Sequence, residues 1–91
     1  MKIEFDSKKS EKNALERELP FQLVEYFEWD AAIYEEDTRK LYPEQRFVAV
    51  GYLNDRLHVV CFTPIIDGIR VISFRKANSR EVRSYEEAIN E

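Results

Sequence analysis

The residues best able to do chemistry are a group of cationic side chains near the end of the chain. They are Arg70, Arg75, Lys76, Arg80 and Arg83. Between residues 69 and 83 only Glu81 is acidic, so this stretch carries a net charge of +4 in a chain whose total is −4. Such a concentration of charge indicates a surface for an anionic ligand. A solvated helix start with ordinary surface arginines is the alternative.

The segment that must position these side chains is "IRVISFRK", whose alternation predicts a strand. Regular alternation would put Arg75 and Lys76 on opposite faces at the end of this strand. The two faces would read Val71, Ser73 and Arg75 on one side, and Ile72, Phe74 and Lys76 on the other.

A helix is expected to begin at Ser79, with Asn78 or Ser79 as its cap. Its first backbone N–H groups would face the end of the preceding strand, where an anion would also meet Arg75 and Arg80. Glu81 and Tyr85 are four residues apart, so they share one side of the helix and could transfer protons near a phosphate. The alternative for Tyr85 is a core anchor of the helix.

The His, Cys, acidic and Gly residues of the chain predict no binding site for a metal or a cofactor. The chain has one His and one Cys, and its carboxylates show no metal-ligand spacing. His58 lies inside an expected strand and is interpreted as a structural or surface histidine, and Cys61 as a buried apolar residue. With only two glycines, no phosphate-binding loop is present. RNA is a substrate that needs no metal, because its 2′-hydroxyl is a nucleophile and arginines can stabilise the phosphorane charge.

The elements that hold these residues indicate one α+β domain over residues 1–91, an antiparallel sheet with N-terminal helices on one face and a C-terminal helix. We expect a first strand at 2–5, helices at 7–15 and 21–29, and a short strand at 31–37. After a loop, turn residues at 54–55 and 67–68 separate three antiparallel strands, at 46–53, 56–65 and 69–76. The last helix would bury Val82, Tyr85 and Ile89.

Targeting signals are not expected in this chain. No apolar run approaches the roughly 20 residues that cross a bilayer, and the start "MKIEFDSKK" lacks the apolar segment of a signal peptide. The expected location is the cytoplasm, with no membrane partner.

Several short motifs, in order, resemble BrnT, the ribonuclease toxin family of type II toxin–antitoxin pairs, which has a RelE-like fold. The opening pattern is matched by Phe5-Asp6, Lys9 and Asn13, the next by Arg46 and Gly51, and an apolar strand ends in Phe62-Thr63. The most specific motif is matched by "RVISFRKANSREVRSY".

This resemblance implies a metal-independent endoribonuclease that works through 2′-hydroxyl attack. It implies a ribbon-helix-helix antitoxin as partner, with DNA reached only through that antitoxin. The implied catalytic residues are Arg75, Glu81, Tyr85 and Arg46. The RNA-binding residues that it implies are Lys9, Asn13, Arg70 and Lys76, and the concentration of positive charge adds Arg80.

Three positions depart from the family pattern. Glu16-Arg17-Glu18 stands where the family usually reads Lys-His-Gly, Ile65 replaces an Arg, and Phe74 replaces a small residue. Two hypotheses therefore remain: an active toxin, or a catalytically weakened relative that binds the antitoxin and helps it repress transcription. A generic acidic interaction domain is a third.

Overall fold

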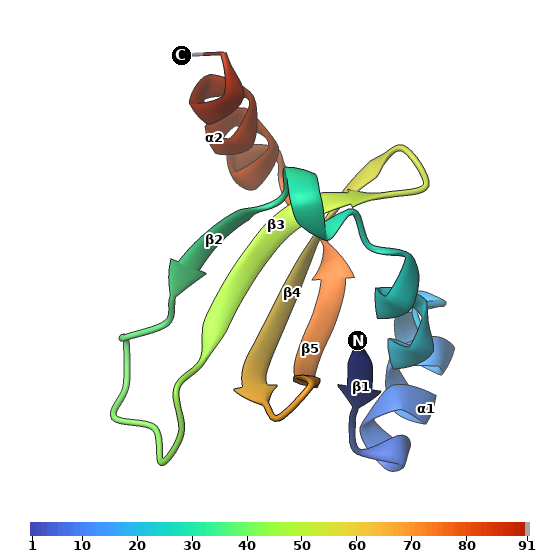
Figure 1. The fold of residues 1–91 in the computed structure, drawn as a ribbon. Helices are drawn as coiled ribbons and strands as arrows, with labels where there is room; N and C mark the ends of the chain where they lie inside the picture. The colour runs from blue at the N-terminus through green and yellow to red at the C-terminus, as the bar shows by residue number, and fades with distance from the viewer. Residues whose placement is uncertain (91) are drawn as a thin grey trace.

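The computed structural model describes residues 1–90 and has five strands in the order β1-β5-β4-β3-β2 (Figure 1). The α+β class is therefore confirmed. No helix in these residues is long and apolar enough to cross a membrane. The elements are β1 (Lys2–Glu4), α1 (Ser7–Arg17), the 3₁₀ helices η1 (Phe21–Tyr26) and η2 (Trp29–Ala31), β2 (Ile33–Glu36), β3 (Phe47–Leu53), β4 (Arg56–Ile65), β5 (Gly68–Lys76) and α2 (Ser79–Ile89).

The three-strand meander β3-β4-β5 is confirmed, and it is antiparallel throughout. Its turns need left-handed backbone, with φ of 49° at Asn54, 62° at Asp55 and 65° at Asp67. Asn and Asp adopt this conformation more readily than other non-glycine residues, which is why the turn prediction worked.

The first strand makes the sheet mixed, which differs from the expected antiparallel arrangement. β1 pairs in parallel with β5, Lys2 opposite Gly68 and Glu4 opposite Arg70. These partners are more than sixty residues apart in sequence, and no local pattern sets their relative direction. The RelE-like fold stays a prediction of the family resemblance.

The prediction of an α-helix over residues 21–29 is wrong. Phe21 to Tyr26 form the 3₁₀ helix η1, after which Phe27 is extended. The buried side chains of Phe21, Val24 and Phe27 are spaced by three residues. A helix with three residues per turn places them on one face, whereas an α-helix would spread them.

Each face of the sheet carries its own hydrophobic cluster. The larger cluster lies under η1 and η2 and includes Phe21, Val24, Val60 and Phe74. On the other face, Tyr85 and Val82 of α2 pack near Leu57 and Val59, which confirms two of the three expected inward residues. The third, Ile89, is 54% exposed because α2 projects beyond the end of the sheet (Figure 1).

A β-bulge in β5 changes which residues share a face. Cys61 pairs with Ser73 but Phe62 pairs with Val71, so Ile72 is the extra residue. Val71 and Phe74 consequently both lie in the larger hydrophobic cluster. The prediction that Val71 shares a face with Arg75 is therefore wrong, since regular alternation fails at a bulge.

The C-cap of α1 suggests a stabilising substitution. Glu18 is left-handed, with φ of 58°, a conformation that disfavours any residue with a Cβ. We expect Glu18→Gly to raise the free energy of unfolding by about 0.5–1 kcal/mol, measured by urea denaturation. Glu16→Gly, inside the helix, is the matched control and should lower it by about 1 kcal/mol. Destabilisation by both substitutions would contradict strain at Glu18.

Candidate functional site

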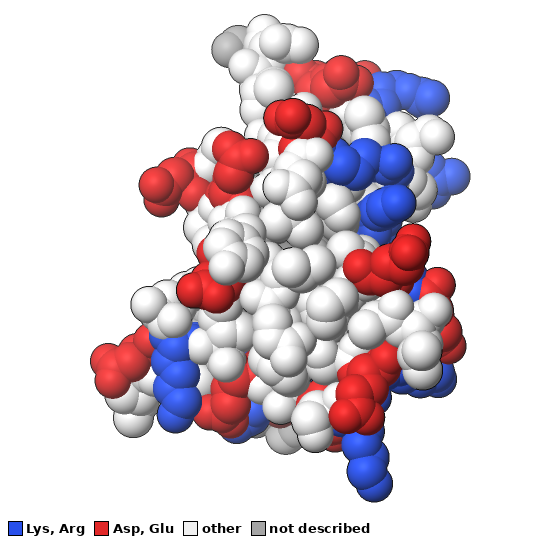
Figure 2. Space-filling view, turned by 90° about the vertical axis from the view of Figure 1, so that its right-hand side faces the viewer, with Lys and Arg blue, Asp and Glu red and all other residues white. Residues whose placement is uncertain are grey.

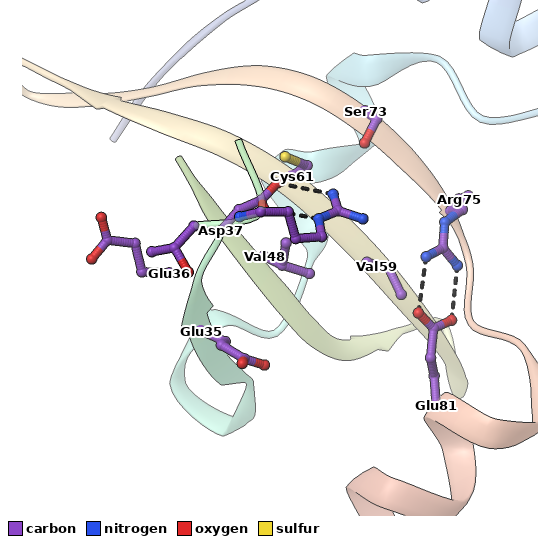
Figure 3. A pocket seen from close by; sticks show the side chains of 11 residues that line it. Glu35, Glu36, Asp37, Val48, Val59, Cys61, Ser73, Arg75 and Glu81 are labelled. Carbon is purple, nitrogen blue, oxygen red and sulfur yellow. Dashed lines mark hydrogen bonds and ion pairs between the residues drawn. The ribbon is translucent and has the colours of Figure 1, made fainter. Parts of the chain in front are cut away.

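The central feature of the site is an ion pair between Arg75, near the end of β5, and Glu81, in the first turn of α2 (Figure 3). Nη1 and Nη2 of Arg75 donate to the two carboxylate oxygens at 2.8 and 2.9 Å. These hydrogen bonds lower the pKa of Glu81 and raise that of Arg75. Glu81 is therefore ionised at neutral pH, and one edge of the guanidinium is already occupied.

The start of α2 is capped by the chain itself. Asn78 Oδ1 accepts the backbone N–H of Glu81, and Glu81 Oε1 accepts the backbone N–H of Asn78, both at 2.9 Å. This reciprocal capping box occupies the N–H of Glu81, one of the first helical amides that were expected to meet an anion. The predicted anion site at this helix start therefore loses one backbone donor, that of Glu81, and otherwise stays a prediction.

Arg75 nevertheless keeps a second pair of donors. Its Nη1 also donates to the carbonyl of Lys76 at 3.3 Å. Within residues 1–90, Nε–H and the second hydrogen of Nη2 have no partner. These two hydrogens point to the same side of the planar guanidinium, which suits bidentate binding of a phosphate. The side chain is 40% exposed, so a ligand can reach this pair.

A group of exposed cations surrounds the end of β5, and we call Arg17, Arg56, Lys76 and Arg80 the cationic edge. Arg17 and Lys76 line a depression of about 400 Å³ together with Arg75. Arg56 reaches the end of the strand by donating from Nη2 to the carbonyl of Ala77 at 3.1 Å. None of the four forms an ion pair with another of the described residues.

Cationic side chains also gather on one part of the molecular surface. On the face that Figure 2 shows, Lys and Arg side chains gather at the upper right, at the height of α2 in Figure 1. Glu16 and Glu18 also border the depression, so the field there is weaker than the cations alone would give.

Sequence reasoning did not assign Arg56 to the site. The available signal was the hairpin register, in which His58 of β4 lies opposite Lys76 of β5. Two residues before His58, Arg56 therefore lies just beyond the end of β5. Placing Arg56 at the site requires the register of the β4–β5 pair, and the alternation of apolar and polar residues alone does not give that register.

A larger cavity, of about 470 Å³, lies on the open face of the sheet (Figure 3). Its floor includes Val48, Val59 and Cys61. On one side Asp37, whose side chain is only 2% exposed, accepts Nε and Nη2 of Arg39, both at 2.9 Å. These bonds hold the pKa of Asp37 well below its usual range. No local pattern in the sequence predicted this pair.

Carboxylates outnumber arginines around this cavity, which makes it a poorer site for RNA than the cationic edge. Glu35 and Glu36 of β2 line it in addition to the two ion-paired carboxylates, against Arg39 and Arg75. An RNA backbone would meet repulsion there.

Two of the predicted cations lie elsewhere. Arg70 donates to Glu4 at 2.8 Å and is five residues before Arg75, about 16 Å along the strand. Arg46 pairs with Glu44 at 3.1 Å and covers the ring of Tyr42. The structure does not bring either side chain to the cationic edge.

Asn13, a predicted RNA-binding residue, is 6% exposed and ties α1 to the sheet. Its Nδ2 donates to the carbonyls of Leu19 and Phe74 at 2.7 and 2.8 Å, and its Oδ1 accepts from Arg17. Lys9 is exposed on α1, beside a separate shallow depression. Roles of both residues in RNA binding stay predictions.

Tyr85, predicted to be catalytic, is instead a core anchor of α2, which was the alternative interpretation. It is 4% exposed, and its hydroxyl donates to the carbonyl of Ala31 at 2.8 Å. Burial raises its pKa. The Tyr85 hydroxyl is therefore bonded within the core, whereas the Glu81 carboxylate binds Arg75. The two side chains do not meet at a common site where both could transfer protons.

The other residues considered for chemistry are His58 and Cys61. His58 is buried, which fits its structural interpretation and not a surface position. Cys61, expected to be buried, is partly exposed, and desolvation raises the pKa of its thiol. Residues 1–90 contain no group of three or more His, Cys, Asp or Glu side chains arranged to hold a metal ion.

These features define a class of protein. It is a small α+β protein with a cationic edge at one end of its sheet, beside Arg75, which has two unbonded N–H donors. The sequence also matches the family described as "Ribonuclease toxin, BrnT, of type II toxin-antitoxin system" over residues 5–81. The chain belongs to this family, which confirms the resemblance. It is therefore a type II ribonuclease toxin by family, with RNA as substrate and an antitoxin as partner. A search of curated proteins found no match.

Proposed function

We propose that this protein cleaves RNA without a metal ion, by attack of a ribose 2′-hydroxyl on the adjacent phosphate. The observation that carries this proposal is the unused Nε–H and Nη2–H pair of Arg75, a residue that lines a depression together with Arg17 and Lys76 of the cationic edge. Arginine matches a phosphate in geometry and stays charged throughout the reaction.

In the proposed reaction the 2′-oxygen forms a bond to phosphorus and the bond to the 5′-oxygen breaks. The products are a 2′,3′-cyclic phosphate and a 5′-hydroxyl end. Negative charge grows on the non-bridging oxygens in the transition state, and the donors of Arg75 stabilise it there. Lys76 and Arg80 hold the neighbouring phosphates, since both are exposed at the same end of the sheet.

Glu81 has a positioning role in this scheme. Its carboxylate accepts three hydrogen bonds, two from Arg75 and one from the Asn78 amide. A carboxylate with three donors has a low pKa and is a weak base. Its bonds to Arg75 hold the guanidinium in the orientation that leaves Nε and Nη2 open.

The inhibitor in this proposal is a ribbon-helix-helix antitoxin, through which the pair reaches DNA. Support for the antitoxin type comes from the sequence motifs of the family. The protein acts in the cytoplasm, where its RNA substrate is found.

The test is cleavage of a defined RNA by the purified protein, with and without EDTA, and analysis of the new ends. We expect cleavage in both buffers, cyclic phosphate ends, and growth arrest when the protein is produced alone. Cleavage that EDTA abolishes would refute metal independence, and 3′-hydroxyl ends would refute 2′-hydroxyl attack.

A second candidate function is a weakened relative that binds the antitoxin and helps it repress transcription. Two observations favour it: Glu81 already occupies one edge of Arg75, and Glu16 and Glu18 border the depression. In that case the protein would cleave no RNA in either buffer, yet would bind the antitoxin and strengthen its binding to operator DNA.

A further inference from the structure

The face of the sheet that carries the larger cavity is only partly covered, and the register shows which residues share it. Glu35, Val48, Cys61 and Ser73 lie directly opposite one another across β2, β3, β4 and β5, so their side chains point to the same face. Val48 and Cys61 are half-buried, while the two residues at the ends of this row are exposed. The row is therefore apolar in its centre and polar at its ends.

A second row lies beside the first and ends at the candidate site. From β2 to β5 it consists of Ile33, Val50, Val59 and Arg75. Helix α2 packs over Val59 and Leu57 at one end of this face and projects beyond the sheet (Figure 1). It leaves Val48 and Cys61 partly exposed. An apolar area left open and rimmed by polar residues is typical of a surface that binds a partner.

The charge of the cavity over this face selects the partner. Its two arginines are each paired with a carboxylate, Arg39 with Asp37 and Arg75 with Glu81. Glu35 and Glu36 also line the cavity and form no ion pair within residues 1–90, so the cavity has an excess of negative charge. Such a surface repels RNA and is complementary to a basic segment of a protein.

We propose that this cavity binds a segment of the antitoxin. The segment places an apolar side chain over Val48 and Cys61 and a Lys or Arg side chain beside Glu35. Membership of the family supplies the antitoxin as a partner. The cavity and the cationic edge carry opposite charge, so the antitoxin segment and the RNA each favour a different surface.

Occupation of the cavity also regulates the candidate site. Arg75 lines the cavity and also lines the depression that Arg17 and Lys76 share. A segment bound over Val59 and Cys61 lies against the guanidinium of Arg75 and restricts access of a phosphate to its unbonded N–H donors. This inhibition depends on the proposed function, whereas the binding of the segment does not.

Cys61 gives a direct measure of occupation, because it is the only cysteine of the chain and lines the cavity. The test follows alkylation of Cys61 by N-ethylmaleimide with mass spectrometry, at about pH 8, where more of the thiol is thiolate. We expect a saturating amount of the antitoxin to slow this alkylation by about tenfold or more. A 2′-O-methyl RNA, which has no free 2′-hydroxyl and is not cleaved, should leave the rate unchanged.

Glu35→Lys tests the charge complementarity. It reverses the charge of an exposed side chain that pairs with no other described residue, so the fold should persist. We expect it to weaken antitoxin binding by about tenfold or more, since like charges then face each other. Glu25→Lys, an equally exposed position on η1, is the matched control and should bind like wild type. Both variants should cleave RNA at the wild-type rate when the antitoxin is absent.

The possible results are distinct. Unchanged alkylation of Cys61 in the antitoxin complex overturns the inference and leaves the proposed function intact, as does equal weakening by the two charge reversals. Shielding of Cys61 by the RNA, or shielding that increases with the concentration of the toxin alone, overturns it in favour of RNA or of a second copy of the chain. If wild type cleaves no RNA while the antitoxin shields Cys61 and Glu35→Lys removes this effect, the binding surface stands and the proposed function fails.

Discussion

Arg75→Ala is expected to lower the rate of RNA cleavage by about 10²–10³-fold, the usual cost of losing one donor group that stabilises transition-state charge. The substitution removes both hydrogen-bonding edges of the guanidinium, including the Nε–H and Nη2–H pair that is open to a ligand. The fold should survive, because Glu81 is partly exposed and keeps its bond to the Asn78 amide. Growth arrest on production of the protein alone should be lost in parallel.

Arg75→Lys distinguishes geometry from charge. Lysine retains the positive charge but not the planar pair of donors, so cleavage should stay at least about tenfold below wild type. Lys40→Ala, an exposed cation in the loop before β3, is the matched control for the loss of one positive charge. Wild-type cleavage by Arg75→Ala would remove the basis of the proposed function.

Asn13→Ala is expected to lower the free energy of unfolding by about 2–4 kcal/mol. The change leaves the carbonyls of Leu19 and Phe74 without their donor at a buried site, and each unsatisfied group costs about 1–3 kcal/mol. Asn13→Asp should destabilise at least as much, because it brings a carboxylate toward two carbonyl oxygens. Urea denaturation of both variants measures the effect.

Lys12→Ala, the neighbouring exposed position on α1, is the control and should change stability by less than about 0.5 kcal/mol. The experiment also tests the predicted role of Asn13 in RNA binding. An Asn13→Ala protein with wild-type stability but weakened RNA binding would show that the side chain contacts RNA and that its hydrogen bonds contribute little to folding.

Much of the fold could be predicted because its signals are local. The meander followed from alternation and from left-handed turns at Asn54-Asp55 and Asp67, and α2 followed from its Asn78 cap. The 3₁₀ helix η1 was missed because a spacing of three between apolar residues also occurs in α-helices. Here the positions of Phe21, Val24 and Phe27 against the sheet selected the tighter winding.

The candidate site was only partly predictable. Clustering of Arg75, Lys76, Arg80 and Glu81 was visible because these residues lie on one strand end and the helix that follows it. Arg56 joins them only through the register of the β4–β5 pair. The parallel pairing of β1 with β5 was hidden for the same reason, since its partners are remote in sequence.

The sequence by itself determined that the chain is an α+β protein with a concentration of cations at one strand end, because alternation, capping and charge are properties of neighbouring residues. Only the tertiary structure decided how those cations are used. It paired Arg75 with Glu81 and buried the hydroxyl of Tyr85 against Ala31. Such choices depend on distances between side chains on different elements, and a hydrogen bond forms or fails over less than an ångström.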